Sequence, residues 1–319
     1  MSRYLAQPLD FSSLSTIPIA ERGGKVRMEH MGAAAGKGLS LSGWLDRLPK
    51  VLAAESLRGV VAALYRAKAN GRGMIWGIGG HVVKCGLAPV LIDLMERGYV
   101  SALAMNGAAS IHDFEIGLAG QTSEDVEAVL PDGRFGSAEE TGREMNEAIR
   151  LAQTEGMGMG EALGARLSEI ADPAFAPACL LLQAWRRKIP VTVHVAIGTD
   201  TPHTHPAADG AAIGAGSHHD FRLLCSYVAD LDDGGVYLNV GSAVVLPEVF
   251  LKAVSAVRNL GHPLSGFTTA NFDFLQHYRP RMNVVQRPHA GSGGAGYAIT
   301  GHHELMIPLL AAALIEKDS

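Results

Sequence analysis

Gly73-Met-Ile-Trp-Gly-Ile78 is an apolar run that stops at Gly79-Gly80-His81, and a helical pattern follows it. Four later apolar runs end in a similar way, at clusters of Gly, Asn, Thr, Ser or Asp. These runs are Val100–Met105, Ile189–Ile197, Val236–Val240 and Phe267–Ala270. Strands of a parallel sheet are buried on both faces and therefore appear as continuous apolar runs. The pattern predicts an α/β protein with a Rossmann-like, mostly parallel sheet and helices on both faces.

Small and polar residues gather where these runs stop. Asn106-Gly107-Ala108 follows the second run, Gly198-Thr199-Asp200 the third, Gly241-Ser242 the fourth and Asn271-Phe272-Asp273 the fifth. In open α/β sheets, ligands bind in a crevice outside the carboxyl ends of the strands. The sequence therefore predicts one large binding site that is assembled from segments far apart in the chain.

The composition is that of an ordinary globular protein, with 47% hydrophobic and 18% charged residues in a chain of 319. A net charge of −5 without a basic block argues against nucleic acid as a partner. The longest apolar stretch, Leu305–Ile315, is shorter than the roughly 20 residues that span a bilayer, so no membrane association is expected. Three widely spaced cysteines and a start without a signal peptide predict a cytoplasmic protein.

We expect a single domain, residues 1–319, in which residues 1–42 form an irregular N-terminal extension. Apolar residues at helical spacing predict helices at Val82–Arg97, Ala174–Lys188, Asp220–Leu231, Leu246–Leu260 and about His302–Ile315. Residues 282–286 predict a further short strand, residues 200–219 a loop and residues 291–296 a Gly-rich turn. Residues 117–172 predict loops between short helices, which suit a lid or an oligomer contact.

The segment Asn106–Asp113 is a candidate for chemistry because it lies where a strand should meet a helix. Gly107 and Ala108 allow close approach of a ligand, and a helix N-terminus attracts anions. His112 and Asp113 would then reach a second part of the ligand. A tight turn with Asp113 as helix N-cap is an equally good interpretation. Gly79-Gly80-His81 is a second such turn, without the full Gly-x-Gly-x-x-Gly pattern.

Carboxylates near the predicted strand ends suit a cationic substrate such as an amine. They are Asp200, Asp209, Asp220, Glu248 and Asp273. Helix capping is the alternative interpretation, most plainly for Asp220 in front of Phe221–Leu231.

Histidines are concentrated between residues 194 and 219. His203 and His205, together with His218 and His219, would be the ligands of a metal-dependent hydrolase. No Asp or Glu stands at a familiar metal-ligand spacing. Hydrogen-bonded or solvated histidines are therefore the preferred interpretation, and we predict no metal site.

Taken in order, the strand-end segments resemble those of the deoxyhypusine synthase superfamily, whose members have a Rossmann-like fold that binds NAD. Gly79–Leu87 resembles the family's Thr-Ser-Asn-Leu-Ile-Ser-Ser-Gly-Leu segment, and Asn106–Asp113 its Gly-Ala-Asn-Ile-x-His-Asp segment. Val195–Asp200, Thr268–Asp273 and Ile307–Leu310 resemble Pro-Ala-Leu-Thr-Asp-Gly, Asn-Thr-Ala-Gln-Glu-Phe-Asp and Phe-Pro-Leu-Leu. The resemblance covers about residues 70–315.

The resemblance implies an NAD cofactor, a small amine or related polar metabolite as substrate, polyamine-type transferase or oxidoreductase chemistry, and a homotetramer. The residues implied for NAD binding are Gly79, Gly80, His81, Asn106, Gly107, Ala108, Asp200, Gly241, Thr269 and Ala270. Asp113 and Asp273 are candidates for substrate binding. The candidates for the base that accompanies hydride removal are His112, His205 and Glu248.

Two departures separate this chain from the family's own reaction. Where the family carries its nucleophilic lysine, this sequence has Asn283-Val-Val-Gln-Arg-Pro-His289, and the family's catalytic histidine has no counterpart in Val240–Glu248. Without that lysine, no covalent imine can form at this position. We therefore expect an NAD-binding relative that does not make deoxyhypusine, with a non-catalytic ligand-binding protein as a further alternative.

Overall fold

Within residues 3–318, which a computed structural model describes, the sheet has six strands, and each neighbouring pair is parallel. The strands are β1 (Met74–Ile78), β2 (Ala102–Asn106), β3 (Val191–His194), β4 (Val236–Val240), β5 (Thr268–Asp273) and β6 (Ala295–Thr300). Their spatial order is β3-β2-β1-β4-β5-β6, the order of doubly wound dinucleotide-binding folds. The predicted Rossmann-like parallel sheet is confirmed.

The chain builds one half of the sheet outward from β1 and then returns to build the other half. β1 lies between β2 and β4, with Ile75 opposite Ala102 on one side and Tyr237 on the other. The strand order therefore reverses between β1 and β4, and ligands of such sheets bind at this point. All five predicted strand ends lie at the same edge, because the strands are parallel.

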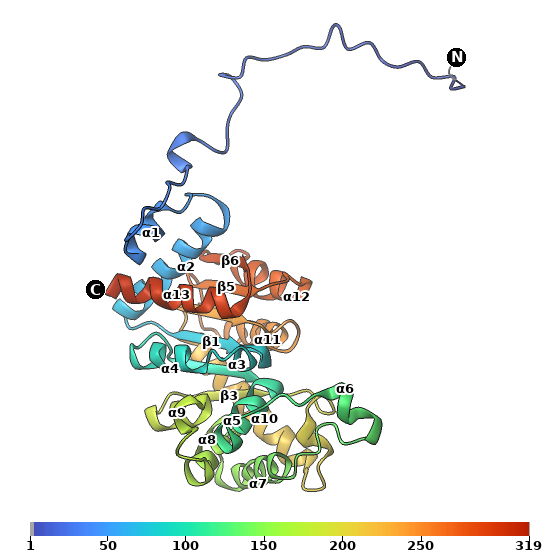
Figure 1. Cartoon of the computed structure of the whole chain (residues 1–319), viewed down its shortest axis with the longest axis vertical. Coiled ribbons are helices and arrows are strands. Elements are labelled where there is room, and N and C mark those ends of the chain that lie inside the picture. The colour runs from blue at the N-terminus through green and yellow to red at the C-terminus, as the bar shows by residue number, and fades with distance from the viewer. Residues whose placement is uncertain (1–2, 319) are drawn as a thin grey trace.

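Helices cover both faces of the sheet (Figure 1). Met74, Trp76 and Ile78 pack into one core with residues of α2, α4, α5, α9 and α13, whereas Ile75 packs into a second core with α10 and α11. The helices are α1 (Leu41–Arg47), α2 (Leu52–Ala69), α3 (Gly80–Lys84), α4 (Ala88–Glu96), α5 (Gly107–Ala119), α6 (Val126–Val129), α7 (Glu139–Glu155), α8 (Met159–Ile170), α9 (Leu180–Arg187), α10 (Gly210–Ala229), α11 (Val245–Asn259), α12 (Tyr278–Pro280) and α13 (His303–Asp318). None of these helices of residues 3–318 combines the length and the apolar character needed to cross a membrane.

Residues 3–40 form an arm that leaves the body and extends well beyond it (Figure 1). Two backbone hydrogen bonds join the base of the arm to the segment after α1, from Ala33 N to Arg47 O and from Lys50 N to His30 O. Ser40 then caps α1 by accepting from the backbone N–H of Gly43. The first helix of the body therefore begins at a defined cap.

One predicted strand is wrong. Residues 281–286 form a short π-helix, and the sixth strand, β6, begins inside the segment predicted as a Gly-rich turn. Most side chains of β6 are partly exposed, so this edge strand lacks the apolar run of the central strands. Gly296 passes directly over the π-helix, since a Cβ on it would lie 1.9 Å from the carbonyl oxygen of Val285.

Helix α10 begins at Gly210, inside the segment predicted as a loop. Asp209 caps it by accepting from the backbone N–H groups of Ala211 and Ala212. Its first half is rich in Gly and Ala and shows no apolar periodicity. Asp220 is therefore not an N-cap: it is buried inside α10 and accepts from Val193 N and Gly160 N. Burial raises the pKa of Asp220 to about 7.

Candidate active site

The glycine-rich ends of β1, β2 and β4 lie against one another. A Cβ on Gly79 would lie 2.1 Å from the carbonyl oxygen of Gly241. A Cβ on Gly80 would lie 2.9 Å from the Cβ of Ala108 and 3.1 Å from the ring of His112. These segments, which the sequence places far apart, therefore converge at one edge of the sheet, and side chains larger than hydrogen do not fit at their contacts.

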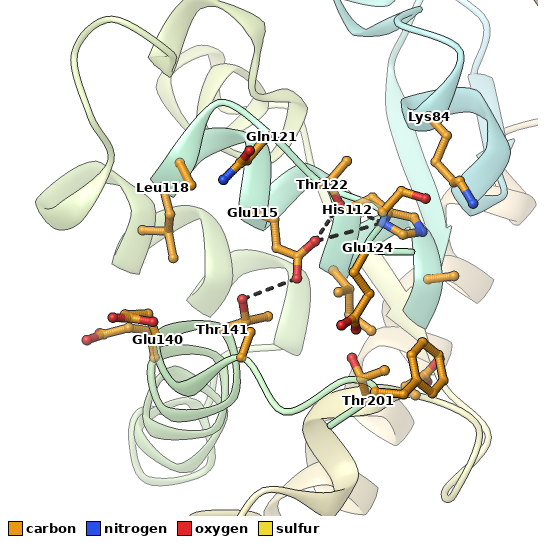
Figure 2. A pocket seen from close by; sticks show the side chains of 18 of the residues that line it. Lys84, His112, Glu115, Leu118, Gln121, Thr122, Glu124, Glu140, Thr141 and Thr201 are labelled. Atoms are coloured by element: carbon orange, nitrogen blue, oxygen red, sulfur yellow. Dashed lines mark hydrogen bonds and ion pairs between the residues drawn. The ribbon is translucent and has the colours of Figure 1, made fainter. Parts of the chain in front are cut away.

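A cavity of about 990 Å³ opens beside this contact. Helix α5 forms one wall, residues 121–144 contribute a second, and Thr199–Thr201 add a third. Polar side chains from these elements point toward a common space (Figure 2). Part of the segment 117–172, for which the sequence suggested a lid or an oligomer contact, is thus a wall of the cavity.

A chain of hydrogen bonds along the cavity wall holds His112 (Figure 2). The Nδ1 of His112 lies 2.7 Å from Oγ1 of Thr122, and the Thr122 hydroxyl donates to Glu115. The other carboxylate oxygen of Glu115 accepts from the Thr141 hydroxyl at 3.2 Å. Because the Thr122 proton goes to Glu115, the proton between His112 and Thr122 belongs to Nδ1 of His112. The Nε2 atom of the neutral ring is then the proton acceptor.

Two nearby influences favour the neutral form of the His112 ring. Burial lowers the pKa of His112, and the ammonium group of Lys84 lowers it further. The side chain of His112 is still 19% exposed and lines the cavity, so a ligand can reach it. A neutral, oriented imidazole with a free ring nitrogen has the geometry of a general base.

The lining of the cavity carries more acidic than basic side chains. Its carboxylates are Glu115, Glu124, Glu140, Glu144 and Asp200, and among the described lining residues the one Lys or Arg is Lys84. Glu144 is already paired: against the opposing effect of burial, Arg166 and Arg143 hold the pKa of Glu144 below its usual value. The remaining carboxylates give the cavity a negative potential, which favours a cationic ligand.

Asp200 combines burial with an oxygen that has no partner. Its side chain is 10% exposed, and among the described residues nothing hydrogen-bonds to its Oδ2, which lies 4.0 Å from Nε2 of His203. Burial raises the pKa of Asp200, against the lowering effects of His203 and Thr199. A Cβ on Gly107 would lie 2.0 Å from this oxygen, so the glycine makes room for the carboxylate. A buried carboxylate oxygen without a hydrogen-bond donor favours a hydroxyl or ammonium group as its partner.

His303 lies outside the predicted set of site residues, yet three members of that set surround it. Its Nε2 lies 3.2 Å from the Phe272 carbonyl oxygen and 3.9 Å from Oδ1 of Asp273. The ring of His81 stands 5.5 Å away, centroid to centroid, and a Cβ on Gly241 would lie 3.2 Å from the His303 ring. The sequence feature that could have pointed to His303 is its position shortly after the last strand, β6.

Two predicted polar residues near the start of α5 serve the fold. The side-chain oxygen of Asn106 caps α5 by accepting from Ala109 N at 2.9 Å. Asp113 is fully buried inside α5, and its two carboxylate oxygens accept from Leu180 N and Leu181 N, each at 2.7 Å. The prediction that Asp113 binds substrate is therefore wrong, because its carboxylate caps α9. Burial raises the pKa of Asp113 to about 6.

Glu248, a predicted base, is held by cationic side chains on α11 and α12. It accepts from Lys252 at 3.1 Å and from Asn283 at 3.0 Å, and it lies 3.2 Å from Nε of Arg279. The hydrogen bond from Lys252 is the largest influence that lowers the pKa of Glu248. A carboxylate stabilised in this way is a weaker base, so the geometry gives this prediction no support.

The histidines of residues 203–219 do not assemble a metal site. His205 lies 3.2 Å from Glu139 through Nε2, and its Nδ1 accepts from Ala207 N, so both ring nitrogens are engaged away from the cavity. Nδ1 of His203 accepts from Gly198 N. Across residues 3–318, no group of three or more His, Cys, Asp or Glu side chains is arranged to hold a metal ion. The prediction of His205 as a base has no support in this geometry.

Thr269 and Ala270 lie inside the sheet, because β5 continues to Asp273. The hydroxyl of Thr269 donates to the Val284 carbonyl at 2.6 Å and lies 2.7 Å from Nε2 of His289. Ala270 is fully buried opposite Leu238. The prediction that these two residues contact a cofactor is therefore wrong, since neither reaches the edge of the sheet.

Solved structures with the same fold are similar to this chain only at low sequence identity. A protein assigned as a deoxyhypusine synthase from Entamoeba histolytica matches with a TM-score of 0.52 and 12% identity, over 89% of this chain and 96% of its own. A conserved LOR/SDH protein from Methanococcus maripaludis S2 matches with a TM-score of 0.53 and 15% identity, over 85% of this chain and 72% of its own. The resemblance to the deoxyhypusine synthase superfamily is thus confirmed for the fold.

A third match has known ligands. AgrE, solved as a ternary complex with ornithine and NAD⁺, matches with a TM-score of 0.53 and 16% identity. The match covers 85% of this chain but 35% of AgrE, so this chain corresponds to about a third of that protein. No protein-family model matches the sequence, and no curated protein is similar to it.

Proposed function

We propose that this protein is an NAD-dependent enzyme that oxidises, or transfers a group from, a small amine or related polar metabolite. The observation that carries the proposal is the oriented His112 on the wall of an acidic cavity at the carboxyl edge of a doubly wound sheet. AgrE, which has a similar fold, binds NAD⁺ and ornithine, an amine, and this supports the proposal. Deoxyhypusine synthesis is not part of it, because the chain lacks the lysine discussed above.

The residues at the sheet edge fit a dinucleotide. Gly79, Gly80 and Gly107 let the segments after β1, β2, β3 and β4 pack closely at the sheet edge. Ligands of doubly wound sheets bind at this edge. The Asp200 carboxylate, which lines the cavity, would accept from a ribose hydroxyl or from a substrate ammonium. His81, Gly241 and Asp273 would complete the cofactor side of the crevice. When bound, NAD supplies the hydride acceptor.

The side chains of the cavity would prepare the substrate for hydride loss. Asp200 and Glu124 would hold a cationic amine in place, and the Nε2 of His112 would take a proton from the reacting nitrogen or oxygen. The imidazolium so formed carries its positive charge 4.0 Å from Glu115, which stabilises it. Thr122 fixes the ring by its hydrogen bond to Nδ1. Residues 121–144 would limit the access of water.

Two measurements test the proposal. Purified protein with millimolar NAD should show a raised thermal midpoint, and a panel of small amines should then give absorbance of the reduced nicotinamide. NAD binding without turnover of any amine would leave a ligand-binding relative and contradict the enzymatic part. A folded protein whose thermal midpoint does not respond to NAD would contradict the cofactor assignment.

A further inference from the structure

The arm carries a concentration of exposed apolar side chains. Of the 24 large apolar residues that are exposed within residues 3–318, 11 lie in the arm. Between residues 5 and 19 they are Leu5, Leu9, Phe11, Leu14, Ile17 and Ile19, with exposed fractions from 62% to 102%. Asp10 is the one charged residue in this stretch. Solvated linkers are poor in such side chains, so this arm segment, residues 5–19, has the composition of a binding element.

The body of the same chain does not cover the arm segment. The hydrogen bonds made by residues 10–29 join residues no more than three positions apart, as in Leu14 N to Phe11 O and Glu21 N to Pro18 O. Figure 1 shows the arm running away from the sheet and its helices. Burial of these side chains therefore requires a surface on another molecule.

The body offers an apolar groove of about 650 Å³ between α10 and α11. Phe221, Cys225 and Ala229 recur at four-residue spacing on α10 and share one face. Ala256 of α11 and Leu260, the C-cap of that helix, form the other side of the groove. Leu260 is 75% exposed. These five residues define the α10/α11 groove. Exposed apolar patches of this kind mark interaction sites.

We propose that the arm segment of one chain docks in the α10/α11 groove of a second copy. Every copy carries both surfaces, so a reciprocal exchange covers both in a closed dimer. The arm segment is long enough: fifteen extended residues reach about 50 Å, whereas residues 219–230, which line the groove, span about 18 Å. The lining of the groove also carries Arg222, opposite in charge to Asp10 of the arm, and Asp230, which has the same charge as Asp10.

A native thiol in the groove allows a direct test by cross-linking. In a Cys85→Ser background, Leu14→Cys places a thiol in the arm, while Cys225 remains in the groove and Cys179 is buried. Mild oxidation should give a disulfide-linked pair of chains, and adding Cys225→Ser should abolish it. The control is Leu305→Cys in the same background, an exposed apolar position outside both surfaces. A disulfide within one chain, or no more cross-linking than in the control, would overturn the proposal.

Light scattering after size-exclusion chromatography measures the assembly itself. The unmodified protein should have at least twice the mass of one chain, and Phe11→Asp and Leu260→Glu should each reduce it to one chain. Leu305→Glu is the control, and circular dichroism with thermal melting verifies folding of all variants. A monomeric unmodified protein, or an oligomer that survives either substitution, would overturn the docking of the arm in this groove.

Discussion

The two halves of the sheet edge carry similar sequence signals but differ in what their side chains do. At β1–β3, His112 keeps a free ring nitrogen and Asp200 an unpartnered oxygen beside the cavity. At β4–β6, Asn239 donates to Asn271, which in turn donates to Gln276, and cationic side chains hold Glu248. The comparison shows that a polar strand end indicates where a ligand can bind, whereas a polar side chain on the wall of a cavity indicates where chemistry can occur.

The largest expected difference between the two halves of the sheet edge is the effect of substitutions on the rate of turnover. His112→Ala should reduce amine-dependent reduction of NAD by about 10²- to 10⁴-fold, because it removes the proposed base. Glu248→Ala, in the other half, is the matched control and should change the rate less than about threefold, since Glu248 does not line the cavity and its partners are Lys252, Arg279 and Asn283. Steady-state kinetics measure both. Equal losses in the two variants would place the chemistry elsewhere.

The free energy of unfolding should depend strongly on Asp113 and weakly on its neighbour His112, whereas turnover should depend strongly on His112. Asp113→Ala leaves the N–H groups of Leu180 and Leu181 buried without acceptors, and each costs about 1–3 kcal/mol. The free energy of unfolding should fall by roughly 2–6 kcal/mol, measured by urea denaturation. His112→Ala should lower it by less than about 1 kcal/mol, because its ring is only partly buried. A mild effect of Asp113→Ala would contradict the capping role.

Ligand affinity should respond to the unpartnered oxygen of Asp200. Asp200→Asn keeps the size of the side chain but removes its charge, so the affinity for a small diamine should fall about tenfold, or 1.4 kcal/mol. Calorimetry with Glu139→Gln as the control measures this, since Glu139 is exposed and does not line the cavity. Unchanged affinity would show that Asp200 does not contact the amine.

The smallest expected effect is a change in the pKa of His112. Lys84→Met removes a cation that lowers the pKa of His112, so this pKa should rise toward the ordinary histidine value, while burial continues to lower it. The pH below which activity is lost should rise with it, because the base must be neutral. Proton NMR titration of the His112 ring measures the shift, and Arg97→Met is the distant control. A downward or absent shift would contradict the electrostatic assignment.

The sequence predicts the fold better than the roles of single residues. Strands β1 to β5 are recognisable because burial on both faces leaves continuous apolar runs, and this holds even for β3 at one edge of the sheet. Strand β6, at the other edge, is largely exposed and lacks such a run. Asp113 and Asp220 bind backbone groups that are 67 and 27 residues away, and no local pattern reveals such partners. The contribution of Glu115 could have been predicted from the sequence, since its i,i+3 spacing from His112 places both residues on one helix face.

Residue 107 is a glycine, and the absence of a Cβ at this position has a consequence for the evolution of this protein. Because the Asp200 carboxylate occupies the space that a Cβ would fill, even alanine at residue 107 would require this carboxylate to move. The same side chain lines the cavity. A substitution at residue 107 would therefore reach the ligand site through Asp200, and selection for a new ligand could act first on this position.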